Sequence, residues 1–183
     1  AAIALVFIGT DRAREILLHL FQEKRTPFLL WCVVEGLAQI KHDSVFQLAE
    51  RLYKHSSVKR IYALYLLGTS GVMGEPHYKA AIKILQGALN HTDLNVRGYA
   101  GRAISYLRIA YSPFQRLLEE HLRDAAYNPE EQWVQRRYIE ALGHVGTPDV
   151  IPTLELYLRS IERRTRQRTR EAIAEIKRRH QLI

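Results

Sequence analysis

Apolar and small residues recur along the chain at successive offsets of four, three, one and three positions. In the clearest copy they are Val96, Ala100, Ala103, Ile104 and Leu107. This spacing places the residues on one stripe of an α-helix, so the sequence predicts a helix over each copy. The copies span residues 29–40, 58–69, 96–107, 134–145 and 165–176.

A second, shorter pattern follows several of these stripes. An aspartate is followed by apolar residues two, five and nine positions later, starting at Asp11, Asp43 and Asp149. We expect the aspartate to cap a helix N-terminus and the three apolar residues to form the buried face of that helix. In the first copy this buried face is predicted to be Ala13, Ile16 and Leu20. Each repeat is therefore predicted to be two helices joined by a short turn.

Repeated helix pairs predict an all-α fold, an α-solenoid of about five antiparallel pairs forming one domain over residues 1–183. Residues 1–8 match the later part of a copy and the chain has no initiator methionine, so we expect it to belong to a longer protein. Residues 67–76 contain three glycines and are the expected hinge of the array.

Two segments resemble the HEAT repeat, particularly the short bacterial form found in phycobilisome-lyase-type proteins. Residues 141–152 read Ala-Leu-Gly-His-Val-Gly-Thr-Pro-Asp-Val-Ile-Pro, and residues 93–97 read Asp-Leu-Asn-Val-Arg. The resemblance implies a stacked helical array whose second helices line a concave face. It implies less about function, because HEAT-like arrays serve as scaffolds, adaptors, regulatory arms and, less often, enzymes.

The helical phase of the two predicted second helices indicates which side chains point away from the core on that face. Phe46 and Tyr53 are expected to be exposed there, and exposed aromatic residues often anchor protein interfaces. With mixed charges around them, they form the first candidate partner-binding set. The set is Arg12, Glu15, His19, Phe46, Glu50, Tyr53 and Lys54.

Positive charge is concentrated at the end of the chain. The net charge of +8 divides into +4 for residues 1–92, −2 for residues 93–158 and +6 for residues 159–183. Two interpretations remain open: a solvated face on the last helix, or a contact surface for an acidic partner or a nucleic-acid backbone. Arginine outnumbers lysine there, which favours bidentate contacts with carboxylate or phosphate. The candidate contacts are Arg163, Arg164, Arg166, Arg170 and Lys177.

The sequence offers little sign of catalysis, and we expect neither a metal nor a cofactor. His121 and Asp124 are close enough on one helix to share a metal, but such a string is usually a solvated face. A HEAT-like class of DNA glycosylases uses Trp and Asp in a basic groove. Trp31 and Trp133 lack an Asp at helical spacing in their own helices.

These observations favour a non-catalytic scaffold or adaptor module that binds another protein. The alternative is a nucleic-acid-binding array using the basic last helix; an alkylpurine glycosylase is less favoured. No apolar run approaches the roughly 18 residues of a membrane span, so no membrane partner is expected. The single cysteine, Cys32, excludes an internal disulfide and favours a reducing, cytoplasmic location. The oligomeric state is left open.

Overall fold

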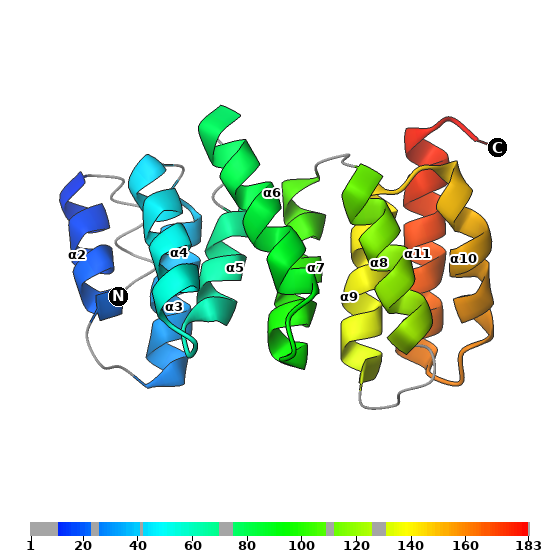
Figure 1. Cartoon of the computed structure of the whole chain (residues 1–183), viewed down its shortest axis with the longest axis horizontal. Coiled ribbons are helices and arrows are strands. Elements are labelled where there is room, and N and C mark those ends of the chain that lie inside the picture. Colours follow the sequence, from blue (N-terminus) through cyan, green and yellow to red (C-terminus); the bar gives the residue numbers. More distant parts are fainter. Residues whose placement is uncertain are drawn as a thin grey trace. The chain divides into compact units, whose positions relative to one another are not determined.

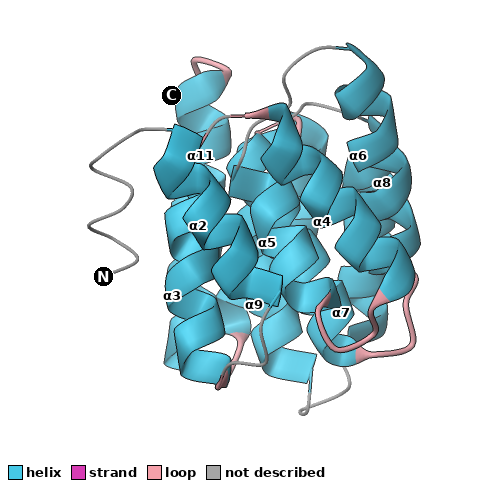
Figure 2. Cartoon of the chain, turned by 90° about the vertical axis from the view of Figure 1, so that its left-hand side faces the viewer, coloured by secondary structure: helices cyan, strands magenta, loops and turns pink. Residues whose placement is uncertain are grey.

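In a computed structural model of the chain, the described residues are 11–22, 26–40, 42–69, 75–108, 112–125 and 131–182. These residues form helices and loops, with no strand among them (Figure 2). Contacts divide the chain into two compact units, Ala1–Ile84 and Leu85–Ile183. The division falls within helix α6, Glu75–Leu89, and each unit is described by itself. The predicted copy in residues 1–8 and residues 70–74 of the glycine-rich segment lie outside the described residues.

The described residues of the first unit form helices α2 to α5 and the greater part of α6 (Figure 1). Helix α3 contacts both α2 and α5, and α4 packs against α5. Aromatic rings join these helices: Trp31 of α3 meets Tyr62 and Tyr65 of α5 edge to face, and Tyr62 also meets Phe21 of α2. The helices are α2 (Asp11–Gln22), α3 (Pro27–Ala38), α4 (Asp43–His55) and α5 (Arg60–Thr69).

In the second unit, three neighbouring helices run in the same direction and form one layer (Figure 1). They are α7 (Leu94–Leu107), α9 (Gln132–Val145) and α11 (Arg163–Arg179). The other layer contains α8 (Ser112–Ala125) and a broken helix. The broken helix consists of η2 (Pro148–Val150), α10 (Ile151–Glu155) and η3 (Leu156–Arg159). The chain is thus an all-α helical-repeat solenoid, as the stripes predict.

The predicted stripes are buried most completely in the second unit. Val134, Tyr138, Ala141, Leu142 and Val145 are all buried in α9. In the first unit, Val33, Gly36 and Leu37 of the stripe beginning at residue 29 are buried, and Ile40 at its end is half-buried. Three residues predicted to be buried are exposed. Leu29 lies in the first turn of α3, Val58 lies before α5 begins, and Ile16 lies on the other face of α2. The buried face of α2 is formed by Ala13, Leu17 and Phe21, a small rotation from the predicted face.

The helix caps differ from two of the aspartate predictions. Asp43 is the first residue of α4, and the preceding His42 is the cap, with its Nδ1 accepting a hydrogen bond from the amide of Ser44 at 3.1 Å. Asp149 lies inside the short helix η2. An aspartate does cap α7, where Asp93 accepts a hydrogen bond from the amide of Asn95 at 2.7 Å. A cap position needs a side chain that accepts a hydrogen bond from an amide of the first turn, and the ring nitrogen of His42 is such an acceptor.

Small residues allow α7, α9 and α11 to approach one another closely. A β-carbon added to Gly143 of α9 would lie 2.8 Å from the Cα of Ala172 in α11. A β-carbon on Gly101 of α7 would lie 3.0 Å from the ring of Tyr138. At Gly143 the obstacle is backbone, which cannot rotate away as a side chain can. The glycine is therefore a condition for the observed packing of α9 against α11.

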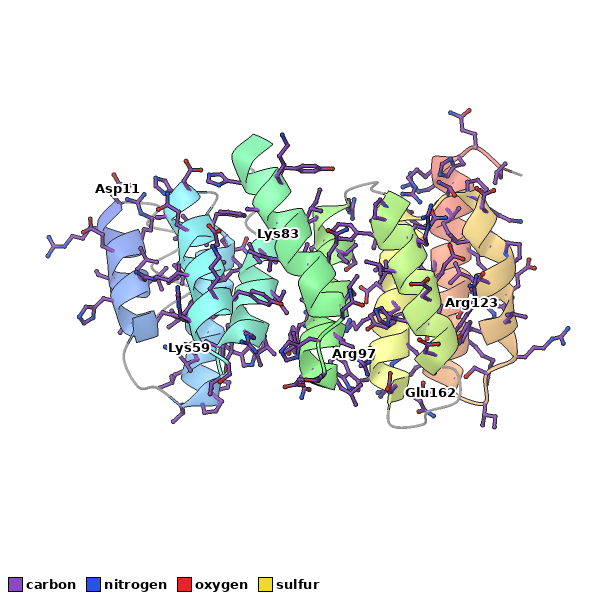
Figure 3. The ribbon with its side chains drawn as sticks, viewed as in Figure 1. Asp11, Lys59, Lys83, Arg97, Arg123 and Glu162 are labelled. Atoms are coloured by element: carbon purple, nitrogen blue, oxygen red, sulfur yellow. The ribbon has the colours of Figure 1, made fainter. Side chains whose placement is uncertain are left out.

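Two ion pairs connect the same three helices at their N-terminal ends. Arg97 of α7 donates to Glu131, the N-cap of α9, at 2.9 Å. Arg136 of α9 donates to both carboxylate oxygens of Glu162, the N-cap of α11. Arg97 and Glu162 lie toward the same end of the unit (Figure 3). Each pair thus joins one helix to the cap of the next and maintains their register.

Gly143→Ala is expected to lower the free energy of unfolding by about 1–3 kcal/mol, because the added methyl group must displace the α11 backbone. Chemical denaturation followed by circular dichroism measures the change. Gly87→Ala is the matched control: Gly87 is exposed on α6, so alanine should be neutral or stabilise by up to about 1 kcal/mol. Equal stability of the Gly143→Ala variant and the parent would contradict the packing argument.

The carboxyl group of Glu162 is expected to make the stability of the folded chain depend on pH. Burial alone raises the pKa of this carboxyl, but hydrogen bonds from Thr165 and Arg136 and the charges of Arg136 and Arg164 outweigh it. The pKa is therefore lowered from its ordinary value of 4.5. Because the folded state holds this proton less tightly than the unfolded state, the stabilisation is present above pH 4.5 and is lost as the pH falls through the lowered pKa.

Glu162→Gln should cost about 1 kcal/mol at pH 7, and the difference from the parent should shrink as the pH falls below 4.5. Urea denaturation at a series of pH values measures it. The exposed Glu155 provides the control, since Glu155→Gln should leave stability unchanged at every pH. A deficit for Glu162→Gln that stays constant into acid would show that the carboxylate charge is not the cause.

Candidate interaction surface

A groove with a volume of about 430 Å³ lies between α9 and α11 in the second unit. Four of its seven lining residues are arginines, and one is a tryptophan. Since the lining comes from two helices of the same layer, the groove opens on the surface of that layer. We call it the arginine groove. Its lining residues are Trp133, Arg136, Arg137, Arg164, Gln167, Arg168 and Glu171.

Trp133 is held in place by α7. The indole occupies the space above Gly98, where any β-carbon would overlap the six-membered ring. Its other neighbour on α7 is Tyr99, whose ring centroid lies 6.2 Å away at an interplanar angle of 63°. The indole is half-buried. It therefore contributes a supported apolar wall to a groove that is otherwise mostly polar.

Three arginines of the arginine groove are paired with glutamates. Arg137 donates to Glu140 at 2.9 Å and Arg168 to Glu171 at 3.0 Å, both within their own helices. Arg136 donates to Glu162 across the two helices. All three use only Nη1 in these bonds. Among the described residues no hydrogen bond engages their Nε or Nη2 atoms, so each guanidinium retains donors for a ligand.

Arg164 is the fourth arginine of the groove and forms no ion pair with any described residue. It is exposed on the first turn of α11. Burial raises the pKa of Glu162, and Thr165 and Arg136 lower it. The charge of Arg164 also lowers this pKa, by a smaller amount. The groove therefore has one positive charge without an ion-pair partner among the described residues, next to three that are already compensated.

An aromatic surface on α7 adjoins the arginine groove. Arg102 lies 5.4 Å from the ring centroid of Tyr106 and donates from Nε to its hydroxyl at 2.8 Å. Burial raises the pKa of Tyr99, and the charges of Arg102 and Arg137 oppose the increase. Tyr99 also contacts Trp133 of the groove. We call Tyr99, Arg102, Tyr106 and Trp133 the aromatic face.

One of the candidate contacts of the last helix lines the arginine groove. Arg164 lines the arginine groove, whereas Arg163, Arg170 and Lys177 are exposed outside its lining. Arg166 has a local structural role: its Nη1 donates to the backbone carbonyls of Ser160 and Ile161, both at 2.7 Å. The predicted set therefore contains one groove residue, three exposed cations elsewhere on α11 and one residue that supports the turn.

The predicted partner-binding set lies in the first unit and includes one error. Phe46 was expected to be exposed but is only 3% exposed, because the ring of His77 from α6 packs on it with centroids 4.4 Å apart. Tyr53 is half-buried, and desolvation raises its pKa against the opposing charge of Arg60. The remaining members are exposed or half-buried. Among them Glu50 and Lys54 pair at 2.8 Å, and Arg12, Glu15 and His19 are exposed on α2.

Most residues of the arginine groove were not among the sequence candidates. Trp133, Arg136 and Arg137 lie three and four residues apart in α9, which places them on one helix face and is a usable signal. The matching signal in α11 is Arg164 followed by Arg168. Nothing in either segment indicates that the two faces meet, since this depends on which surface of α9 packs against α11. The sequence alone therefore supplies two halves of the groove without joining them.

In the part of the chain that the structure describes, no group of three or more His, Cys, Asp or Glu side chains is arranged to hold a metal ion. His121, one of the residues considered for metal binding, lies 3.2 Å from Asn90 Oδ1 through its Nε2. None of the described helices has the length and apolar character required to cross a bilayer.

The comparisons with known proteins identify the fold. No family model matches the sequence, and a search of curated proteins found no significant match. Several solved structures are similar. An engineered protein has a TM-score of 0.61 at 16% identity, covering 97% of this chain and 85% of that one. A designed armadillo repeat protein has a TM-score of 0.53 at 14% identity, and the match covers 96% of this chain and 91% of that one.

A third similar structure is human deoxyhypusine hydroxylase in complex with glycerol. It has a TM-score of 0.50 at 17% identity, covering 97% of this chain and 78% of that one. At these identities the similarity establishes a helical-repeat solenoid and carries no information about activity.

Proposed function

We propose that this chain is a non-catalytic helical-repeat module that binds a partner protein through the aromatic face and the adjoining arginine groove. The observation that supports this most directly is the composition of the surface: tryptophan, tyrosine and arginine from three helices meet in one place. These are the three residue types that contribute most to binding energy at protein interfaces. The repeat is proposed to be HEAT-like, on the residues of segments 93–97 and 141–152.

The distribution of charge also favours a protein partner. Glu140, Glu162 and Glu171 alternate with the arginines, so the surface presents both signs within a short distance. Protein interfaces use such mixed patterns to select one partner and orient it. A cytoplasmic location is proposed with this function, since the single cysteine, Cys32, is a free thiol.

A photo-crosslinking residue in place of Tyr106 tests the proposal. Tyr106 is 39% exposed on the aromatic face, so a bound partner should be within reach. Crosslinked proteins from the source organism are identified by mass spectrometry, and each candidate is then purified and its affinity measured by calorimetry. Tyr106→Ala and Arg137→Ala should each weaken binding about tenfold or more, the usual loss at an interface hot spot.

The control for this experiment is Arg116, which is exposed on α8 in the other layer of the same unit. Arg116→Ala removes the same charge as Arg137→Ala and should leave the affinity within about twofold of the parent. Crosslinking from position 116 should not recover the partner. If the partner binds the Tyr106→Ala and Arg137→Ala variants as tightly as the parent, the aromatic face and the adjoining arginine groove are not its binding surface.

Nucleic-acid binding is the second candidate, and the tertiary structure provides an observation in its favour. Aromatic rings and arginines that are separated in sequence are interleaved on this surface, as on proteins that stack single-stranded bases. Titration with single-stranded DNA and RNA at several salt concentrations tests it. If the surface binds nucleic acid, the logarithm of the binding constant should fall linearly with the logarithm of the salt concentration. The slope should be about −0.7 per neutralised phosphate for single strands and about −0.9 for duplex. Our proposal predicts no saturable binding.

The glycosylase alternative has less support in the groove. Its chemistry was expected to need an Asp near a Trp, and the lining residues of the arginine groove contain no Asp. Glu171 is the acidic residue of that lining, and Arg168 and Gln167 both donate hydrogen bonds to it. Release of alkylated bases from DNA is the corresponding assay, and a non-catalytic module should show none.

A further inference from the structure

We propose that the arginine groove binds one carboxylate of an acidic peptide segment in the partner, while an adjacent apolar side chain of that segment packs on Trp133. This inference rests on the proposed function and specifies the chemistry of its partner. It follows from the charge balance of the groove, the donors left on its arginines and the supported position of the indole.

The charge balance matches a single anion. Four arginines line the groove, and three carboxylates compensate them. Glu171 belongs to the lining, and Glu140 and Glu162 pair with Arg137 and Arg136 from outside it. Four positive charges and three negative ones leave a single positive charge, which is that of Arg164. One incoming carboxylate neutralises the site. A nucleic-acid backbone would bring several phosphates close to these glutamates, and like charges at short range are unfavourable.

The unused donors suit a carboxylate. Arg136, Arg137 and Arg168 direct only Nη1 toward their glutamates, so Nε and Nη2 remain on each. A guanidinium that presents two parallel N–H groups binds a carboxylate in bidentate fashion. Because the glutamates already restrain three of the guanidinium groups, less side-chain entropy is lost when a ligand binds.

The apolar part of the site is also fixed before binding. Gly98 provides space for the indole of Trp133, and Tyr99 contacts its ring, so the side chain is supported by a second helix. The groove volume of about 430 Å³ lies within the range of ligand clefts, about 300–1,000 Å³. An aspartate or glutamate next to a leucine or similar residue would place its two side chains on the two parts of the groove.

Fluorescence of Trp133 in the full chain tests the proposal directly. Trp31→Phe leaves Trp133 as the sole tryptophan, and its emission reports occupancy of the groove. The probe is a peptide with blocked ends containing the sequence Gly-Leu-Asp-Leu-Asp-Gly. The comparison peptide replaces both aspartates with asparagine. Saturable binding with Kd below about 1 mM is expected for the acidic peptide, with the amide peptide at least about tenfold weaker.

Variants of α11 provide a matched series. Arg164→Ala and Arg168→Ala remove groove residues and should each weaken binding of the acidic peptide about tenfold or more. Arg163→Ala and Arg170→Ala remove the same charge from the same helix outside the groove lining, and should change the affinity less than twofold. Arg164→Lys should bind more weakly than the parent, because an ammonium lacks the fork of the guanidinium. Circular dichroism verifies that every variant is folded.

Three results would overturn the inference. They are equal weakening by Arg163→Ala and Arg164→Ala, equal binding of the acidic and amide peptides, and tighter binding of single-stranded oligothymidylate than of the acidic peptide at the same salt concentration. The outcome is separable from that of the proposed function. A partner whose affinity falls on Tyr106→Ala but not on Arg164→Ala would leave the aromatic face as its binding surface and would exclude the groove.

Discussion

The close approach of α7, α9 and α11 is the constraint on which the second unit depends. Parallel helices can touch along their backbones only where side chains are small, and Gly143 against Ala172 meets this condition between α9 and α11. Between α7 and α9, Gly101 accommodates the ring of Tyr138. These contacts determine which surface of each helix faces its neighbour. The side chains that remain on the open surface of the layer are a consequence of that packing.

The arginine groove and the aromatic face both derive from this arrangement. The groove forms where the lining residues of α9 and α11 are long, while the glycine contact at Gly143 belongs to the later turns of α9. Arg136 reaches Glu162 across the two helices, so the same ion pair that maintains the register also supplies one wall of the groove. Residues that fix the packing therefore also line the groove, as is common in repeat proteins whose neighbouring units build a continuous surface.

The two units differ in how well helical periodicity predicts burial. In α9 every predicted stripe position is buried, because helices pack against both sides of α9 within its layer. In α4 the predicted face was too narrow: Val45 and Leu48 are buried as expected, and Phe46 is buried as well by His77. A stripe indicates the centre of a buried face. Its width depends on which neighbours are present, and these are distant in sequence.

The sequence by itself determined the all-α fold, the positions of the repeated helices and the concentration of arginine in the last helix, since each of these is a local property of residue type and spacing. It also contained both halves of the groove, Trp133 with Arg136 and Arg137, and Arg164 with Arg168. Only the tertiary structure decided that these halves meet, that Arg166 supports a turn and that Arg164 lacks an ion-pair partner among the described residues. Such facts depend on distances between helices, which backbone packing sets and local periodicity does not encode.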